Sequence, residues 1–134
     1  MFYIQEMNRY TKQRQVFKPG KNFSRQDLMK KIVQLSEQIT AVRVPSLLSY
    51  LPDTFVYILA DKNGLVIIDT GGAGSGPLIM EGVRSMGFSG SDISAVLLSH
   101  WHGDHTGGLA GLVNNIPGCQ DLPVFIGEAD MPYL

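Results

Sequence analysis

The sequence has little of several features that would narrow its class at once. Only one cysteine, Cys119, occurs in the 134 residues, which excludes an internal disulfide and favours a reducing compartment. No apolar run reaches the length of a membrane span, and the first residues lack the apolar core of a signal peptide. The net charge of −1 points to no particular partner. We therefore expect a cytoplasmic protein without a membrane segment.

Basic side chains are few and unevenly placed. Eight of the eleven Lys and Arg residues lie within residues 1–31, where only Glu6 and Asp27 oppose them. We predict a basic N-terminal arm over 1–23 and a folded domain over 24–134. A basic arm can touch nucleic acid, but a solvated lead-in is the commoner outcome for such a segment. We therefore do not expect nucleic acid as the partner.

The folded domain begins with a segment of helical spacing. Apolar residues recur at positions 28, 32, 35 and 39, after a start at Ser24 that resembles a capping box. This spacing predicts an amphipathic helix over 25–39, followed by a short strand over 40–44. The apolar segment 47–51 fits either a loop beside the active site or part of the core.

Further along, paired strands give way to alternating strands and helices. Strands are predicted over 54–60 and 65–69, joined by a hairpin turn at 61–64 in which Asn-Gly supplies the positive φ angles. A helix from Pro77 to Met86 is capped by Gly87. Then come a strand over 95–99, a helix over 108–114 and a strand over 123–126. The pattern predicts an α/β fold, a mixed sheet covered by helices.

All three histidines of the chain fall within six residues. His100, His102 and His105 stand in a segment with Asp104, directly after an apolar strand and before Thr-Gly-Gly. Imidazole and carboxylate are the groups that hold zinc at neutral pH. Residues two apart in an extended segment point to the same side, so His100 and His102 can approach one ion together. Asp104 and His105 follow at the turn and can reach a second ion, which predicts most of one wall of a two-metal site.

This segment resembles the signature of the metallo-β-lactamase superfamily, His-x-His-x-Asp-His at the end of a strand. Upstream, 66–71 is similar to the family's apolar strand ending in Asp-Thr-Gly, and 91–99 to its lead into the metal loop. Downstream, 123–129 resembles the next strand and the start of its helix. The similarity covers about residues 54–134. It implies the N-terminal half of an αββα sandwich.

The resemblance also implies roles for individual residues. His100 and His102 would bind one zinc ion, and Asp104 and His105 a second, although other divalent metals are possible. Asp104 would in addition hold the hydroxide that bridges the two ions, which makes it the catalytic residue. Asp69 would either support the metal loop from beside the ligands or serve only as the turn residue of Asp-Thr-Gly. The implied activity is hydrolysis of a small-molecule ester, thioester or lactone.

The chain also departs from the family pattern. The family takes further ligands, histidines and a bridging aspartate, from the second half of its domain, and no histidine follows His105 here. We therefore expect an N-terminal portion of the hydrolase domain, truncated at its C-terminus, that is inactive alone and self-associates through exposed apolar surface. Two alternatives stay open: a nucleic-acid-processing nuclease of the same superfamily, and a non-catalytic metal-binding remnant.

Overall fold

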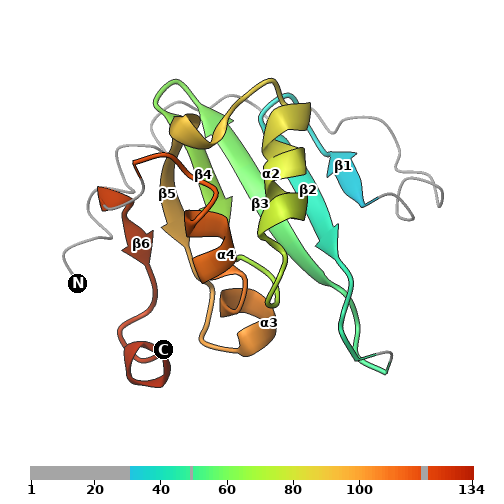
Figure 1. Ribbon diagram of the computed structural model, residues 1–134, viewed down its shortest axis with the longest axis vertical. Helices are drawn as coiled ribbons and strands as arrows, with labels where there is room; N and C mark the ends of the chain where they lie inside the picture. The colour runs from blue at the N-terminus through green and yellow to red at the C-terminus, as the bar shows by residue number, and fades with distance from the viewer. Residues whose placement is uncertain (1–30, 49, 119–120) are drawn as a thin grey trace.

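One mixed six-stranded sheet organises the chain (Figure 1). The structure, a computed structural model, describes residues 31–48, 50–118 and 121–134, so the basic arm predicted over 1–23 lies outside the described residues. The strands lie side by side in chain order: β1 (Ile32–Gln34), β2 (Ile39–Val44), β3 (Thr54–Asp61), β4 (Gly64–Ile68), β5 (Ile93–Leu97) and β6 (Val124–Phe125). The first four pair antiparallel, whereas β5 is parallel to β4 and β6 is parallel to β5.

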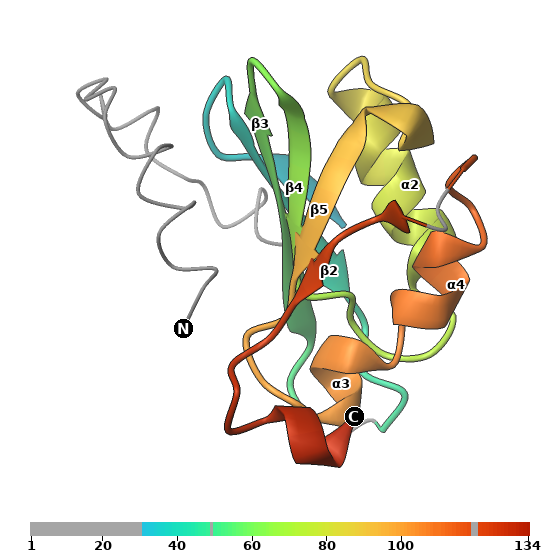
Figure 2. The ribbon, with the colours of Figure 1, turned by 90° about the vertical axis from the view of Figure 1, so that its left-hand side faces the viewer.

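Two helices cover one face of this sheet. Helix α2 (Gly76–Ser85) connects β4 to β5, and α4 (Leu109–Val113) lies between β5 and β6; both pack on the same side (Figure 2). Parallel neighbours need such crossover connections. The other helical segments among the described residues are short: η2 (Gly90–Asp92), α3 (Gly103–Thr106) and η4 (Met131–Tyr133). In the part of the chain that the structure describes, no helix is long and apolar enough to cross a membrane.

The hydrophobic core lies between the sheet and these helices. Side chains of β2 to β5 interlock there with the inner faces of α2 and α4; Val42, Ile58, Ile67, Ile79, Val83, Val96 and Leu112 are each 0% exposed. The β-branched residues of the strands suit a pleated, packed surface. Pro77 stands at the start of α2 and Gly87 follows its end with a φ of 83°. These local signals explain why the strands and the helix were predicted close to their observed bounds.

The helix predicted over 25–39 is wrong in its described part. Residues 32–34 form β1, which pairs antiparallel with β2 through Ile32 and Val42 and through Gln34 and Thr40. The hairpin closes where the backbone N–H of Leu35 donates to the carbonyl of Ile39, at 2.8 Å. Because β-branched residues also suit strands, pairing with a neighbouring strand overrides the helical spacing. Residues 25–30 lie outside the described residues.

The hairpin between β3 and β4 is placed as predicted but turns differently. Asp61 pairs with Gly64, so the two loop residues are Lys62 and Asn63. Gly64 has a φ of 123°, whereas Asn63 does not adopt a positive φ. The Asp61 carboxylate instead accepts the N–H of Asn63 at 2.7 Å. This local hydrogen bond stabilises the turn although Asn63 and Gly64 do not both adopt a positive φ.

Candidate metal centre

The parallel pairing of β4 and β5 brings two distant parts of the sequence to one edge of the sheet. Ile68 and Leu97 are register partners near the ends of their strands. The residues that follow each strand therefore emerge next to each other, and the backbone N–H of Asp69 donates to the carbonyl of Leu97 at 2.8 Å. The Asp-Thr-Gly turn thus lies beside the start of the histidine loop.

Asp69 is the residue that ties the two segments together. It is 6% exposed, and its φ of 61° is a left-handed conformation that residues other than glycine rarely adopt. Its Oδ1 accepts the backbone N–H of Ser99 at 2.7 Å. Its Oδ2 lies 2.8 Å from the Ser99 Oγ, which donates to it, and 2.8 Å from Nδ1 of His105. These contacts are of the kind expected for a residue that supports the histidine loop, and that role of Asp69 stays a prediction.

The next residues of the turn hold the far end of the histidine loop. Both the backbone N–H and the Oγ1 of Thr70 donate to the carbonyl of His105, at 2.7 and 2.9 Å. The N–H of Gly108 donates to the carbonyl of Gly71 at 2.9 Å. A Cβ at Gly108 would overlap the Thr70 carbonyl oxygen, so the Gly-Gly after the histidines permits this close approach.

The four predicted ligand residues gather on and before α3. The ring centroids of His100 and His102 are 4.7 Å apart, and those of His100 and His105 are 4.1 Å apart. The Asp104 side chain is 60% exposed, and its Oδ2 lies 3.6 Å from Nε2 of His105. The same oxygen accepts the Oγ1–H of Thr54, at the start of β3, at 3.4 Å. The loop therefore presents three imidazoles and one carboxylate within a small region of the surface.

The side chains gathered here are of the types that bind zinc. Imidazole nitrogen and carboxylate oxygen are zinc ligands, and a carboxylate on the second ring nitrogen is the usual support of a zinc-binding histidine. The Asp69–His105 contact has this form. Among the described residues, however, no three His, Cys, Asp or Glu side chains converge as a finished metal site. The assignment of the four ligands thus stays a prediction.

Aromatic side chains flank the histidines on one side. Trp101 stands between His100 and His102 in the sequence, and its ring lies 4.6 Å from that of His102 at a steep angle of 79°. Tyr133, in η4, stacks on Trp101 at 5.2 Å and 30°. Trp101 remains 41% exposed and Tyr133 64% exposed. The C-terminal residues therefore add one exposed ring, Tyr133, to the exposed ring of Trp101 in the loop.

The loop between β2 and β3 meets the centre where it ends, because the Thr54 hydroxyl contacts Asp104. It leads into Thr54, and its apolar residues lie at the surface: Leu47 is 83% and Tyr50 78% exposed, so this segment is a loop and not part of the core. Asp53 stabilises the end of this loop, because its carboxylate accepts the backbone N–H of Ser46 at 3.1 Å and the Nε–H of Arg43 at 2.6 Å. The Ser46 N–H is the largest single cause that lowers the pKa of Asp53, and the Arg43 guanidinium lowers it further, despite partial desolvation.

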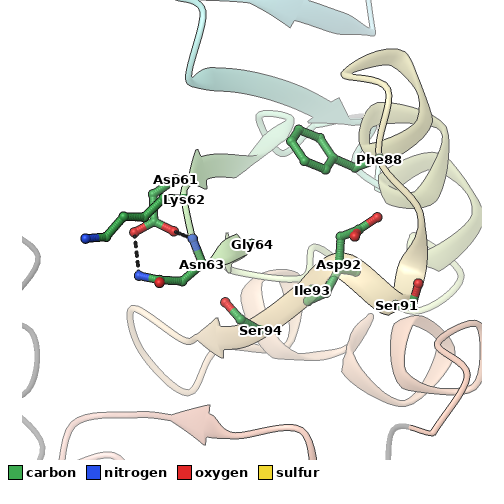
Figure 3. Close-up of a pocket in the computed structure, with 9 residues that line it drawn as sticks. All are labelled: Asp61, Lys62, Asn63, Gly64, Phe88, Ser91, Asp92, Ile93 and Ser94. Carbon is green, nitrogen blue, oxygen red and sulfur yellow. Dashed lines mark hydrogen bonds between the residues drawn. The ribbon is translucent and has the colours of Figure 1, made fainter.

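A shallow groove of about 370 Å³ lies at the opposite edge of the sheet, between the β3–β4 turn and η2 (Figure 3). Its carboxylates are engaged locally: Asp61 accepts the Asn63 N–H, and Asp92 accepts the backbone N–H and Oγ–H of Ser89. These Ser89 bonds lower the pKa of Asp92. None of the predicted site residues lines this groove.

Three residues of the centre were missed by the sequence reasoning. Ser99, Thr54 and Thr70 each place a hydroxyl on the loop or on its supporting carboxylate. Ser99 and Thr70 are neighbours of predicted residues, but no spacing rule marks a hydroxyl as a contact across strands. Thr54 lies 50 residues from Asp104, so only the strand pairing brings them together.

Residues 50–125 match the family model described as the Metallo-beta-lactamase superfamily. The chain belongs to this superfamily. The matched span contains both the Asp-Thr-Gly turn and the histidine loop. The fold agrees: a subclass B3 metallo-beta-lactamase of Bradyrhizobium japonicum, BJP-1, superposes with a TM-score of 0.59 at 27% identity, over 77% of this chain and 35% of that chain. The recognition and the metallo-β-lactamase-type α/β fold predicted from the sequence are thereby confirmed.

Curated members of the superfamily are similar over the same region. An atrochrysone carboxyl ACP thioesterase of Passalora fulva is 39% identical over 92 residues, which are 63% of this chain and 26% of that protein. A lactamase-like protein of Pestalotiopsis microspora is 45% identical over 67 residues, 50% of this chain and 21% of that protein. The chain therefore spans about a quarter or less of the length of these relatives.

Proposed function

We propose that this chain carries one wall of the active site of a metal-dependent hydrolase of small thioester, ester or lactone substrates. The observation that carries the proposal is the buried carboxylate of Asp69, which is hydrogen-bonded to the loop bearing all three histidines. Superfamily membership supports the reaction class. A thioester is our first choice of substrate because a relative of 39% identity is named as a thioesterase.

In this proposal His100 and His102 hold one zinc ion, and Asp104 and His105 hold a second. Zinc would supply a bound water with a pKa lowered toward about 7 and would polarise the substrate carbonyl. The chain's own residues would hold the ligand rings in place and orient the attacking water. Asp69 fixes the His105 ring through Nδ1, and Asp104 is exposed enough to accept a hydrogen bond from the attacking water. The exposed rings of Trp101 and Tyr133 beside the loop would contact the acyl part of the substrate.

The test combines zinc binding with a substrate panel on protein that carries residues 1–134. We expect zinc to bind the wild-type chain weakly and His102→Ala more weakly still. Glu81→Ala, an exposed change on α2, is the matched control and should bind as the wild type does. Hydrolysis is to be measured in a longer protein that contains residues 1–134 together with the remaining ligands, where an acyl thioester should be hydrolysed in preference to a phosphodiester. An unchanged zinc affinity in His102→Ala, or faster hydrolysis of the phosphodiester, would contradict the proposal.

Where hydrolysis is measurable, two substitutions should reduce the activity by different amounts. His102→Ala removes a proposed ligand and should abolish most of the activity. Asp69→Asn keeps the shape of the side chain but replaces one acceptor oxygen, and loss of such a supporting contact typically costs about 10–100-fold. The measurement is kcat/KM at saturating zinc. Equal and small effects of both changes would mean that the loop is not the catalytic centre.

A further inference from the structure

The carboxylate of Asp69 determines where one histidine carries its proton. An ionised carboxylate can only accept hydrogen bonds, so a ring nitrogen 2.8 Å from Oδ2 must be the donor. That nitrogen is Nδ1 of His105. In the neutral ring the other nitrogen, Nε2, is then unprotonated and available to a ligand.

Ser99 extends the same reasoning to a second histidine. Its Oγ lies 2.8 Å from Oδ2 of Asp69 and 2.9 Å from Nδ1 of His100. A hydroxyl has one proton, and the carboxylate on one side can only accept it. The lone pairs of Oγ therefore face His100, whose Nδ1 must be the donor. This leaves Nε2 of His100 unprotonated as well.

The backbone keeps Ser99 in this place. Its own N–H donates to Oδ1 of Asp69 at 2.7 Å, so the residue contacts both oxygens of one carboxylate. Asp69 in turn is held by the pairing of β4 with β5 and by its left-handed backbone. The bonded chain thus runs from His100 through Ser99 to Asp69 and on to His105.

We infer that Ser99 is a positioning residue that sets the tautomer of His100, so that one buried carboxylate prepares Nε2 of two histidines at once. The inference deepens the proposed function, because His100 and His105 are assigned there to different zinc ions. It concerns the protein before metal binds, and its primary test needs neither metal nor substrate.

The experiment is ¹⁵N-imidazole NMR on the full 134-residue chain without metal, at about pH 8 where a histidine of ordinary pKa is neutral. In the wild type we expect His100 and His105 to be protonated at Nδ1. In Ser99→Ala, His100 should change to the Nε2–H form that free histidine favours, while His105 keeps its Nδ1 proton. Ser99→Thr retains the hydroxyl and should restore the wild-type pattern. Ser94→Ala, which removes a hydroxyl at the other end of β5, should change neither ring.

Zinc affinity provides a second readout. Ser99→Ala should weaken binding by about 10–100-fold, the usual effect of losing such a contact, and Ser99→Thr should not. Wild-type His100 protonated at Nε2, or an unchanged His100 tautomer in Ser99→Ala, overturns the inference; the first result does so even if Ser99→Ala fails to fold. If the tautomers behave as expected but zinc does not bind, the proposed function fails and the role of Ser99 stands.

Discussion

The two faces of strand β3 carry side chains of similar hydrophobicity in very different surroundings. Val56 and Ile58 point toward α2 and α4 and are 0% exposed. Phe55 and Tyr57 alternate with them on the other face, stack on each other at 6.4 Å, and are 37% and 38% exposed. Alternation along the strand therefore determines only which residues share a face. Whether that face becomes core depends on what covers it.

The candidate metal centre depends on the covered face. The strands β4 and β5, which lead into Asp69 and Ser99, lie inside the sheet and not at its edges, and their inward residues Ile67 and Val96 are 0% exposed. The helices of the two crossovers, α2 and α4, bury these residues, and the crossover through α2 makes β5 parallel to β4. Burial on one face is thus what places the centre at the strand ends, while the other face contributes little to it.

The sharpest test of this difference uses two neighbours on β3. Ile58→Ala should destabilise the fold by about 2–5 kcal/mol, because it leaves a cavity between sheet and helices. Tyr57→Ala should cost about 1 kcal/mol or less, because the ring is partly in water already. The midpoint of urea unfolding at unchanged slope measures both. Equal losses would show that the two faces are packed alike.

The second test concerns what the less covered face does in solution. We propose that copies of this chain associate through Phe55 and Tyr57, since a contiguous apolar patch promotes association. Changing both residues to Thr keeps strand propensity and should shift the sedimentation profile toward the monomer. Leu47→Ser, in the exposed loop, is the control and should leave association unchanged. A wild-type chain that is a monodisperse, cooperatively unfolding monomer without binding of a hydrophobic dye would refute the proposal.

A smaller effect is expected from a polar atom on the covered face. Thr40 is 1% exposed, and within the described part of the chain its Oγ1 is a buried side-chain atom without a hydrogen-bond partner. Replacing the hydroxyl by the methyl group of Val should stabilise the fold by about 1 kcal/mol, since desolvation of an unpaired hydroxyl is costly. Thr54→Val is the matched control, because that hydroxyl donates to Asp104. A gain in melting temperature for Thr54→Val but not for Thr40→Val would contradict this reading.

The smallest effect involves the ion pair of the other face. Bonds from Ser46 and Arg43 lower the pKa of Asp53 in the folded state, so its contribution to stability is present above the unfolded pKa and is lost as pH falls through the folded pKa. Asp53→Asn should therefore flatten the stability profile below about pH 4. Arg43→Gln should flatten it only in part, because the Ser46 N–H, the largest single cause of the lowered pKa, remains in place. Unfolding midpoints recorded from neutral to acid pH check both, and a steeper acid limb in Asp53→Asn would be the wrong sign.

The parts of the fold that could be predicted from sequence are those with local signals. The strands β3 and β4 are runs of β-branched residues, and α2 is bounded by Pro77 and Gly87. The segment over 32–39 carries two compatible patterns, helical spacing and strand-forming residues, and only its pairing with β2 decides between them. The sequence of this segment alone does not indicate that a neighbouring strand will pair with it.

The residues of the candidate centre also include some that the sequence predicts and some that it does not. The four proposed ligands and Asp69 could be predicted from composition and resemblance, because the proposed ligands cluster within a short segment; their roles stay predictions. Ser99 and Thr54 could not be predicted, since their contacts cross from one strand end to another. Strand pairing fixes those contacts, and a pattern read along the chain does not report them.

The position of Trp101 makes the centre observable without any label. It is the one tryptophan of the chain, and its ring lies against His102 and Tyr133. Its emission therefore arises wholly from the histidine loop, and a protonated imidazole at that distance is expected to quench it. Any event that moves or charges His102 would appear in the ultraviolet fluorescence of the unmodified protein, at concentrations low enough to keep copies apart.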